Sequence, residues 1–259
     1  MTNLRERIEA ARAPSGGVAL WWLAQAGFAF KSSAGAVLYV DPYLSNVVER
    51  AFGFKRLSLA PIDAQDVRAD WVISSHEHLD HLDTDALPVI ARKNPQCRFA
   101  GPDSCAPEYE KCGIALERCL IMSPGNTYQA GDVAIHTTQA DHGELSPSAL
   151  SLLLDFGKVR VLFTGDTALR LPWMQPLIDR RPTILLTCIN GRYGNLNPVE
   201  AAQLARAVNP KIVIPCHFWM FKEHNGDPES FVQACAELCP DVQLKILSPG
   251  EGIEVSDDV

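Results

Sequence analysis

The feature that most constrains this chain is the stretch SSHEHLDHLD, residues 74–83, which holds three histidines and three carboxylates within ten positions. It continues the apolar run DWVISS, which has the pattern of a buried strand, and runs into DTDALPVIARKN, which predicts a helix ending in basic residues. Crowding so many imidazoles and carboxylates at one strand-to-helix turn is energetically costly, and metal coordination is the main role that offsets this cost. The fold must therefore bring other ligand-bearing loops to this turn.

The remaining pattern predicts strands in both halves and helices mostly in the second half. The first seventeen residues read as a helix, residues 18–33 as one strand and residues 36–45 as another. Further runs typical of strands are CRFAGP, DVAIHTTQA, LSLLLDF, VRVLFTGD, TILLTCI and KIVIPCHF. NPVEAAQLARAV and DPESFVQACAEL begin with a capping residue followed by proline, as helices do. We expect one layered α/β domain over residues 1–259, with functional loops after the strand ends.

Composition narrows the class of protein. The chain has 259 residues, of which 47% are hydrophobic, enough to bury one substantial core. It shows no apolar run of membrane-spanning length and no signal-sequence pattern, so we expect a cytoplasmic protein without a membrane partner. The net charge of −8 disfavours nucleic acid as a partner. A small-molecule substrate is the predicted partner, and association into a homo-oligomer is left open.

Candidate ligands elsewhere in the chain follow predicted strands: His142, Asp166 and His217. Within the histidine-rich turn, residues two apart on an extended loop can point to one side, whereas Asp80 and His81 can turn toward a second ion. A carboxylate has two oxygens, so Asp166 can bridge. Two divalent ions roughly 3.5–4 Å apart would then share a water or hydroxide. Mixed imidazole and carboxylate ligands suit zinc or manganese, with iron as an alternative.

The HxHxDH turn, a histidine after QAD, an aspartate in TGDT and a histidine in IPCH resemble, in this order, the metallo-β-lactamase superfamily. The resemblance runs from about Val18 to Gly250. It implies an α/β fold, a four-layer αββα sandwich of two mixed sheets with metals at one edge. The first ion would take His76, His78 and His142; the second would take Asp80, His81 and His217, with Asp166 bridging.

Within the superfamily, DPYLS, residues 100–126 and the segment NPKIVIPCHFWMF are similar to the branch containing L-ascorbate-6-phosphate lactonase. This resemblance implies a hydrolase that opens a small sugar-acid lactone, with or without a phosphate, by attack of a metal-bridging hydroxide. Asp80 and Asp166 would belong to the catalytic groups. Two alternatives stay open: a phosphodiesterase acting on a small cyclic or dinucleotide substrate, and a non-catalytic protein that binds a ligand through its metal site.

Other polar residues surround these ligands in the sequence. Asp41 ends a predicted strand and can hold a ligating imidazole by accepting its other N–H, although an Asp before proline also forms turns. The candidate substrate contacts come from two late loops: Arg192, Tyr193, Asn195, Lys222 and His224. Tyr193 is the favoured contact to the carbonyl or leaving group. Because Arg192 and Lys222 would favour a phosphate or carboxylate, the sequence predicts an anionic substrate.

Overall fold

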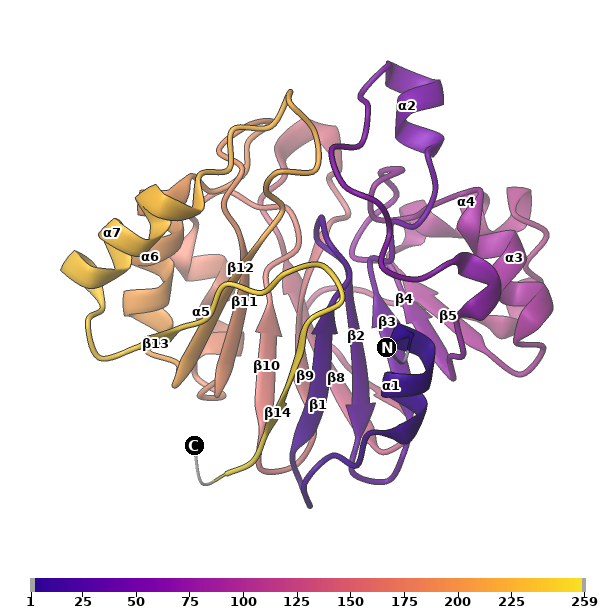
Figure 1. Cartoon of the computed structure of the whole chain (residues 1–259), viewed down its shortest axis with the longest axis horizontal. Coiled ribbons are helices and arrows are strands. Elements are labelled where there is room, and N and C mark those ends of the chain that lie inside the picture. The colour runs from indigo at the N-terminus through magenta and orange to yellow at the C-terminus, as the bar shows by residue number, and fades with distance from the viewer. Residues whose placement is uncertain (1–2, 258–259) are drawn as a thin grey trace.

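Two seven-stranded sheets stack face to face in the computed structural model, which describes residues 3–257 (Figure 1). The first sheet has the order β14 (Gly252–Val255), β1 (Val18–Trp22), β2 (Phe28–Ser32), β3 (Val37–Val40), β4 (Trp71–Ile73), β5 (Arg98–Gly101) and β6 (Cys119–Ile121). The second has the order β13 (Gln243–Leu244), β12 (Ile212–Cys216), β11 (Ile184–Cys188), β10 (Arg160–Phe163), β9 (Leu150–Asp155), β8 (Val133–Gln139) and β7 (Thr127–Ala130). Both sheets mix parallel and antiparallel pairs, so the predicted αββα sandwich is confirmed.

Helices cover the outer face of each sheet. Those beside the first sheet are α1 (Leu4–Ala10), α3 (Ala86–Lys93) and α4 (Ala106–Lys111), while α2 (Val47–Phe52) projects beyond it (Figure 1). Those beside the second sheet are α5 (Leu171–Ile178), α6 (Pro198–Val208) and α7 (Pro228–Leu238). As their sequences predict, α6 and α7 begin at Asn197 and Asp227, whose side chains accept backbone N–H bonds. No helix within residues 3–257 has the length and hydropathy of a membrane span.

The interpretation of residues 18–33 as one strand is wrong. The chain reverses over residues 23–27, where the Leu23 N–H donates to the Gly27 carbonyl and β1 pairs antiparallel with β2. Ala24 and Gln25 take left-handed conformations with φ of 70° and 49°. The sequence hides this hairpin because neither position carries the Gly or Asn that usually marks positive φ in a tight turn.

Strand direction decides where the ligand-bearing loops meet. In the second sheet β8, β10, β11 and β12 all run the same way, because β9 is antiparallel to both of its neighbours and the later pairs are parallel. In the first sheet β1, β3 and β4 share a direction for the same reason. The loops that follow these strands therefore gather at two common edges, one in each sheet, and the site lies where these edges meet.

The layer between the sheets is a continuous apolar core. Phe163 in β10 is fully buried and meets Phe28 of the opposite sheet edge-to-face, with ring centroids 6.3 Å apart. This contact joins the two sheets near the edge at which the loops converge. Aromatic pairs of this geometry contribute beyond the area that they bury.

We expect Phe163→Ala to lower the free energy of unfolding by about 3–5 kcal/mol, because the lost ring leaves a cavity between two sheets that cannot close over it. Urea unfolding at equilibrium measures the change. Leu59→Ala is the control, since Leu59 is 90% exposed and its truncation should cost about 0.5 kcal/mol or less. Similar losses in the two variants would contradict this account of the core.

Candidate metal centre

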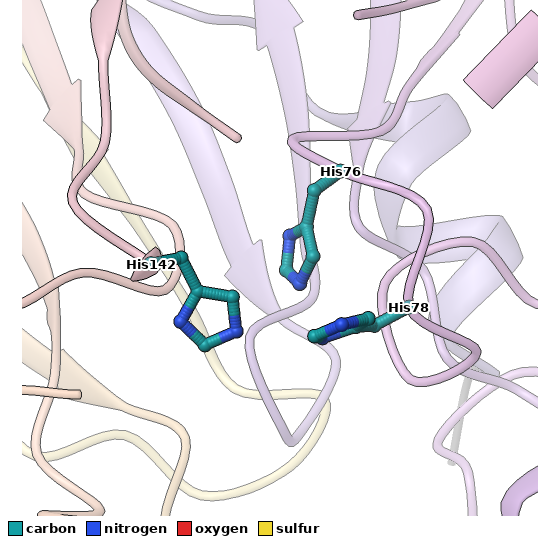
Figure 2. A group of neighbouring side chains, drawn as sticks. All are labelled: His76, His78 and His142. Carbon is teal, nitrogen blue, oxygen red and sulfur yellow. The ribbon is translucent and has the colours of Figure 1, made fainter. Parts of the chain in front are cut away.

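Three histidine rings converge at the edge of the sheets (Figure 2). His76 and His78 come from the turn after β4, and His142 comes from the loop after β8. Their ring centroids lie 4.5, 5.2 and 5.1 Å apart, and one nitrogen of each lies within 4.8 Å of the others. The three imidazoles thus form one compact group of nitrogen donors, here called the first ligand group.

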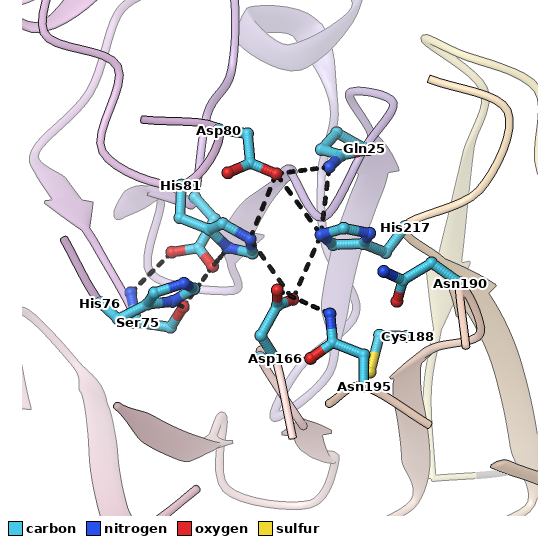
Figure 3. Close-up of polar contacts among 12 residues, drawn as sticks. Gln25, Ser75, His76, Asp80, His81, Asp166, Cys188, Asn190, Asn195 and His217 are labelled. Atoms are coloured by element: carbon cyan, nitrogen blue, oxygen red, sulfur yellow. Dashed lines mark hydrogen bonds and ion pairs between the residues drawn. The ribbon is translucent and has the colours of Figure 1, made fainter. Parts of the chain in front are cut away.

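A second ligand group lies beside the first and combines Asp80, His81 and His217. Asp166, from the loop after β10, faces it through Oδ1, which lies 3.3 Å from His81 Nε2 and 3.2 Å from His217 Nε2. Asp80 Oδ2 completes a ring of four atoms, at 3.7 Å from His81 Nε2 and 3.5 Å from His217 Nε2 (Figure 3). Asp166 Oδ2 points toward the first group, 3.8 Å from His142 Nε2.

The spacing of these atoms fits a divalent ion. Tetrahedral ligands about 2.0–2.1 Å from zinc lie roughly 3.3–3.4 Å from one another, close to the four separations in the ring of Asp80, His81, Asp166 and His217. Two inward-facing atoms are also buried without a hydrogen-bond partner among the described residues: His76 Nε2 and His142 Nε2. Unpaired buried polar atoms are costly, so this cluster is built to receive a ligand.

Charge within the cluster shifts the pKa values of its members. Burial would lower the pKa of His217, but Asp166 and Asp80 outweigh it and raise this pKa to about 9. Burial likewise opposes protonation of His81, yet the neighbouring carboxylates raise its pKa well above the usual value. Burial would raise the pKa of Asp166, which His217 and His81 instead hold well below its usual range. Without ions, protons on the two histidines thus balance the buried carboxylates.

Asp41 orients one of these imidazoles from behind. It follows β3, is fully buried and accepts a hydrogen bond from His81 Nδ1 at 2.6 Å. Its carboxylate also accepts from the Ser75 N–H at 2.6 Å and from the Ser75 hydroxyl at 2.5 Å. The bond to Nδ1 leaves His81 Nε2 facing the cluster, which is the arrangement that ligating histidines commonly use.

The five residues predicted to contact the substrate lie in three different places: in the cavity, behind Asp166 and on the surface. Tyr193 and His224 line a cavity of about 410 Å³ whose floor is the ligand cluster. Asn195 is buried and donates to Asp166 Oδ2 at 2.7 Å, so it holds a carboxylate instead of facing the cavity (Figure 3). Arg192 and Lys222 are exposed and do not line the cavity.

The cavity walls hold residues that the sequence interpretation missed. They are mainly apolar and aromatic: Val48, Phe52, Phe54, Leu79, Leu145 and Phe221. Phe52 and Phe54 come from the end of α2 and the residues after it, a segment without any periodic signal in the sequence. Phe54 lies between Phe221 and Tyr193, with ring centroids 6.1 and 6.5 Å away. A second hollow, of about 670 Å³ beside Trp173, contains none of the cluster residues.

Stacked mixed sheets with a histidine and aspartate cluster at their shared edge define the class of metallo-β-lactamase-fold proteins. The sequence profile of the beta-lactamase superfamily domain matches residues 19–217, so the chain belongs to the beta-lactamase superfamily. Fold, cluster and family together make it a metal-dependent hydrolase. The family and the enzyme class predicted from the sequence are therefore confirmed.

Individual relatives support this placement. The chain is 28% identical over 249 residues to a metal-dependent hydrolase of Aeropyrum pernix, covering 91% of this chain and 96% of that protein. It is 25% identical over 276 residues to a probable L-ascorbate-6-phosphate lactonase of Escherichia coli, covering 87% and 76%. The crystal structure of an isothiocyanate hydrolase from Delia radicum gut bacteria has the same fold, with a TM-score of 0.75, 18% identity, and coverage of 92% of this chain and 99% of that one.

We expect Asp166→Ala to lose metal from both ligand groups, because one carboxylate oxygen faces each group. His136→Ala is the matched control, since His136 contacts Thr127 and Arg180 instead of the cluster. Elemental analysis after saturation with zinc and gel filtration measures the bound metal. Equal losses in the two variants would show that Asp166 does not connect the groups.

Metal loading at neutral pH should release protons, because His81 and His217 hold raised pKa values without ions and must be neutral to coordinate. The release should fall above pH 9, where His217 has already lost its proton. The apparent metal affinity should correspondingly weaken as the pH is lowered. Calorimetric titration in buffers of different ionisation enthalpy counts the protons. If the number of protons released per bound ion were the same at neutral pH and above pH 9, the assigned protonation states would be contradicted.

Proposed function

We propose that this hydrolase opens the ring ester of a small lactone by using two divalent ions, zinc or manganese, held by the two ligand groups. The observation that carries the proposal is the position of both groups at the floor of one cavity with mainly apolar walls. Ions held there would lower the pKa of a bound water from about 15.7 toward 7 and polarise an ester carbonyl. The similarity to a probable lactonase supports this reaction type, because a lactone is a ring ester with a carbonyl open to attack.

The residues of the chain have distinct roles in this proposal. The first ligand group, from two different sheets, would hold one ion through three imidazoles. Asp80 and Asp166 would bring negative charge to the second ion, and Asp166 faces both groups, one carboxylate oxygen toward each. Asp41 and Asn195 keep His81 and Asp166 in orientation through their buried hydrogen bonds. Preorganised ligands of this kind need little rearrangement during the reaction.

Two polar side chains reach the cavity from outside the cluster. Tyr193 is 47% exposed and is held in a left-handed conformation, with φ of 55°, which projects it from the loop after β11. His224 stacks on His217 with ring centroids 4.8 Å apart, and burial, with the neighbouring charge of His217, lowers its pKa to about 4. We assign Tyr193 and the neutral His224 to hydrogen bonds with the ester and the leaving alcohol.

The cavity favours an uncharged substrate with an apolar body. No lysine or arginine is among its lining residues, while Phe52, Phe54 and Phe221 form a wall opposite the cluster. Burial of apolar surface against such a wall contributes about 25 cal/mol per Å². The sequence prediction of a sugar-acid lactone rests on the family resemblance, whereas the prediction that this lactone is anionic depends on Arg192 and Lys222, which are exposed and do not form this wall.

A metal-reconstituted assay with matched lactones tests the substrate. We expect a neutral lactone with an alkyl chain to have a higher kcat/KM than the same ring with a carboxylate or phosphate, because no cationic side chain faces the cavity. Phe54→Ala should raise KM for the alkyl lactone about tenfold or more, which corresponds to about 1.4 kcal/mol or more of lost apolar contact. Proton release during hydrolysis gives the rates.

The same assay contains the outcomes that would change the proposal. Preference for the anionic lactone, lost in Arg192→Ala or Lys222→Ala, would restore the sequence prediction of an anionic substrate. Cleavage of a phosphodiester without any lactone opening would replace the lactonase by a phosphodiesterase. Ligand binding without turnover of either bond type by the metal-loaded protein would favour the non-catalytic alternative.

A further inference from the structure

Gln25 lies against the second ligand group although nothing in its sequence context marks it as a site residue. It sits in the hairpin turn between β1 and β2, and its side chain is fully buried, which is unusual for glutamine. Figure 3 shows its amide outside the ring of four ligand atoms, beside the edge formed by Asp80 and His217. Its position therefore leaves the centre of the ring free for an ion.

The side-chain amide contacts two members of that group. Gln25 Nε2 donates to Asp80 Oδ2 at 2.6 Å, which is the oxygen that also faces the ligand nitrogens of His81 and His217. The same nitrogen lies 3.1 Å from His217 Nε2. An N–H donor on one side of Asp80 Oδ2 fixes the rotation of this carboxylate and leaves its other side toward the ring.

The backbone of Gln25 makes a second, independent connection to the same group. Its carbonyl accepts the His217 N–H at 2.8 Å and the Trp22 indole N–H at 3.0 Å. His217 has φ of 60°, so its backbone is held in a conformation that a histidine rarely adopts without support. The carbonyl of Gln25, in the first sheet, thus anchors a ligand at the end of β12 in the second sheet.

The turn is conformationally costly, which separates this arrangement from ordinary packing. Ala24 and Gln25 both have positive φ, and a non-glycine residue in this region costs on the order of 1–3 kcal/mol. Gln25 Oε1 is in addition buried without a hydrogen-bond partner among the described residues. Both the positive φ and the unpaired side-chain carbonyl lower the stability of the fold. A glutamine with these two costs therefore indicates a role in the site.

We propose that Gln25 is the positioning residue of the second ligand group, orienting Asp80 through its side chain and His217 through its backbone. This inference rests on the proposed two-ion centre and adds the residue that sets the affinity of one ion relative to the other. Gln25 does not touch the first ligand group in the described contacts. Its loss should therefore weaken the second ion selectively.

Two substitutions separate the functions of the side chain and the backbone. Gln25→Asn suits a left-handed conformation but is one methylene too short to reach Asp80. Gln25→Glu keeps the length and replaces the donor by an acceptor that repels Asp80. Both preserve the backbone carbonyl that binds His217. Gln129→Asn, at an exposed position of strand β7, is the control for the amide-shortening substitution.

Zinc titration of the metal-free full-length protein by calorimetry, with thermal melting at each zinc concentration, measures the effect. We expect two ions in the wild type and in Gln129→Asn. In both Gln25 variants the second ion should bind about 10–100-fold more weakly, as for other residues that orient metal ligands, while the first ion keeps its affinity. The rise in melting temperature that accompanies binding of the second ion should be smaller in these variants. If Gln25→Asn fails to fold, the measurement on Gln25→Glu alone tests the inference.

Other outcomes overturn the inference in distinguishable ways. Wild-type affinity for both ions in Gln25→Asn and Gln25→Glu would show that Gln25 does not position the group, while the two-ion centre would stand. Equal weakening of both ions would show that the glutamine supports the fold as a whole. A wild type that binds only one ion would overturn the two-ion centre, and the role of Gln25 with it.

Discussion

The contact of one carboxylate with imidazoles from both sheets is the constraint on which the site depends. Asp166 Oδ1 lies between His81, which follows β4 of the first sheet, and His217, which follows β12 of the second. These atoms can meet only if the sheets stack with the loops after their parallel strands at facing edges. The apolar layer that joins Phe28 to Phe163 therefore does more than stabilise the fold, because it fixes the distance across which the ligands must converge.

Backbone strain gathers at the same edge. Gln25, Asp41, Tyr193 and His217 all have positive φ, and each contacts the cluster or lines the cavity above it. Residues in such conformations persist only where the surrounding structure determines them, and they concentrate at functional sites. The stacked sheets supply this support. The strain in turn directs side chains that regular strands would point elsewhere, so that they converge on one cluster.

The sequence predicted the fold and the residues of the histidine and aspartate cluster from one kind of signal, and it missed residues that lack this signal. The ligation of ions by the cluster stays a prediction. Candidate ligands such as His76 and His142 were recognisable because several histidines and carboxylates that follow strand ends indicate a metal site. Asn195 was noticed but placed against the substrate, because sequence shows that an amide is near a site without showing which way it points. Gln25 and Phe54 were missed, since Gln25 has positive φ without being Gly or Asn and Phe54 follows a short helix without periodicity.

Charge is distributed unevenly between the floor and the walls of the cavity. The carboxylates of Asp41, Asp80 and Asp166 each lie within 3.7 Å of an imidazole nitrogen, so their negative charge is balanced within the cluster. The walls above them are aromatic, and the basic side chains of the neighbouring loops turn to solvent. Three polar side chains, Glu77, Tyr193 and His224, interrupt this apolar surface. In the proposed function, such a cavity would recognise the ester by its position against the cluster and the rest of the molecule by its fit to the aromatic wall.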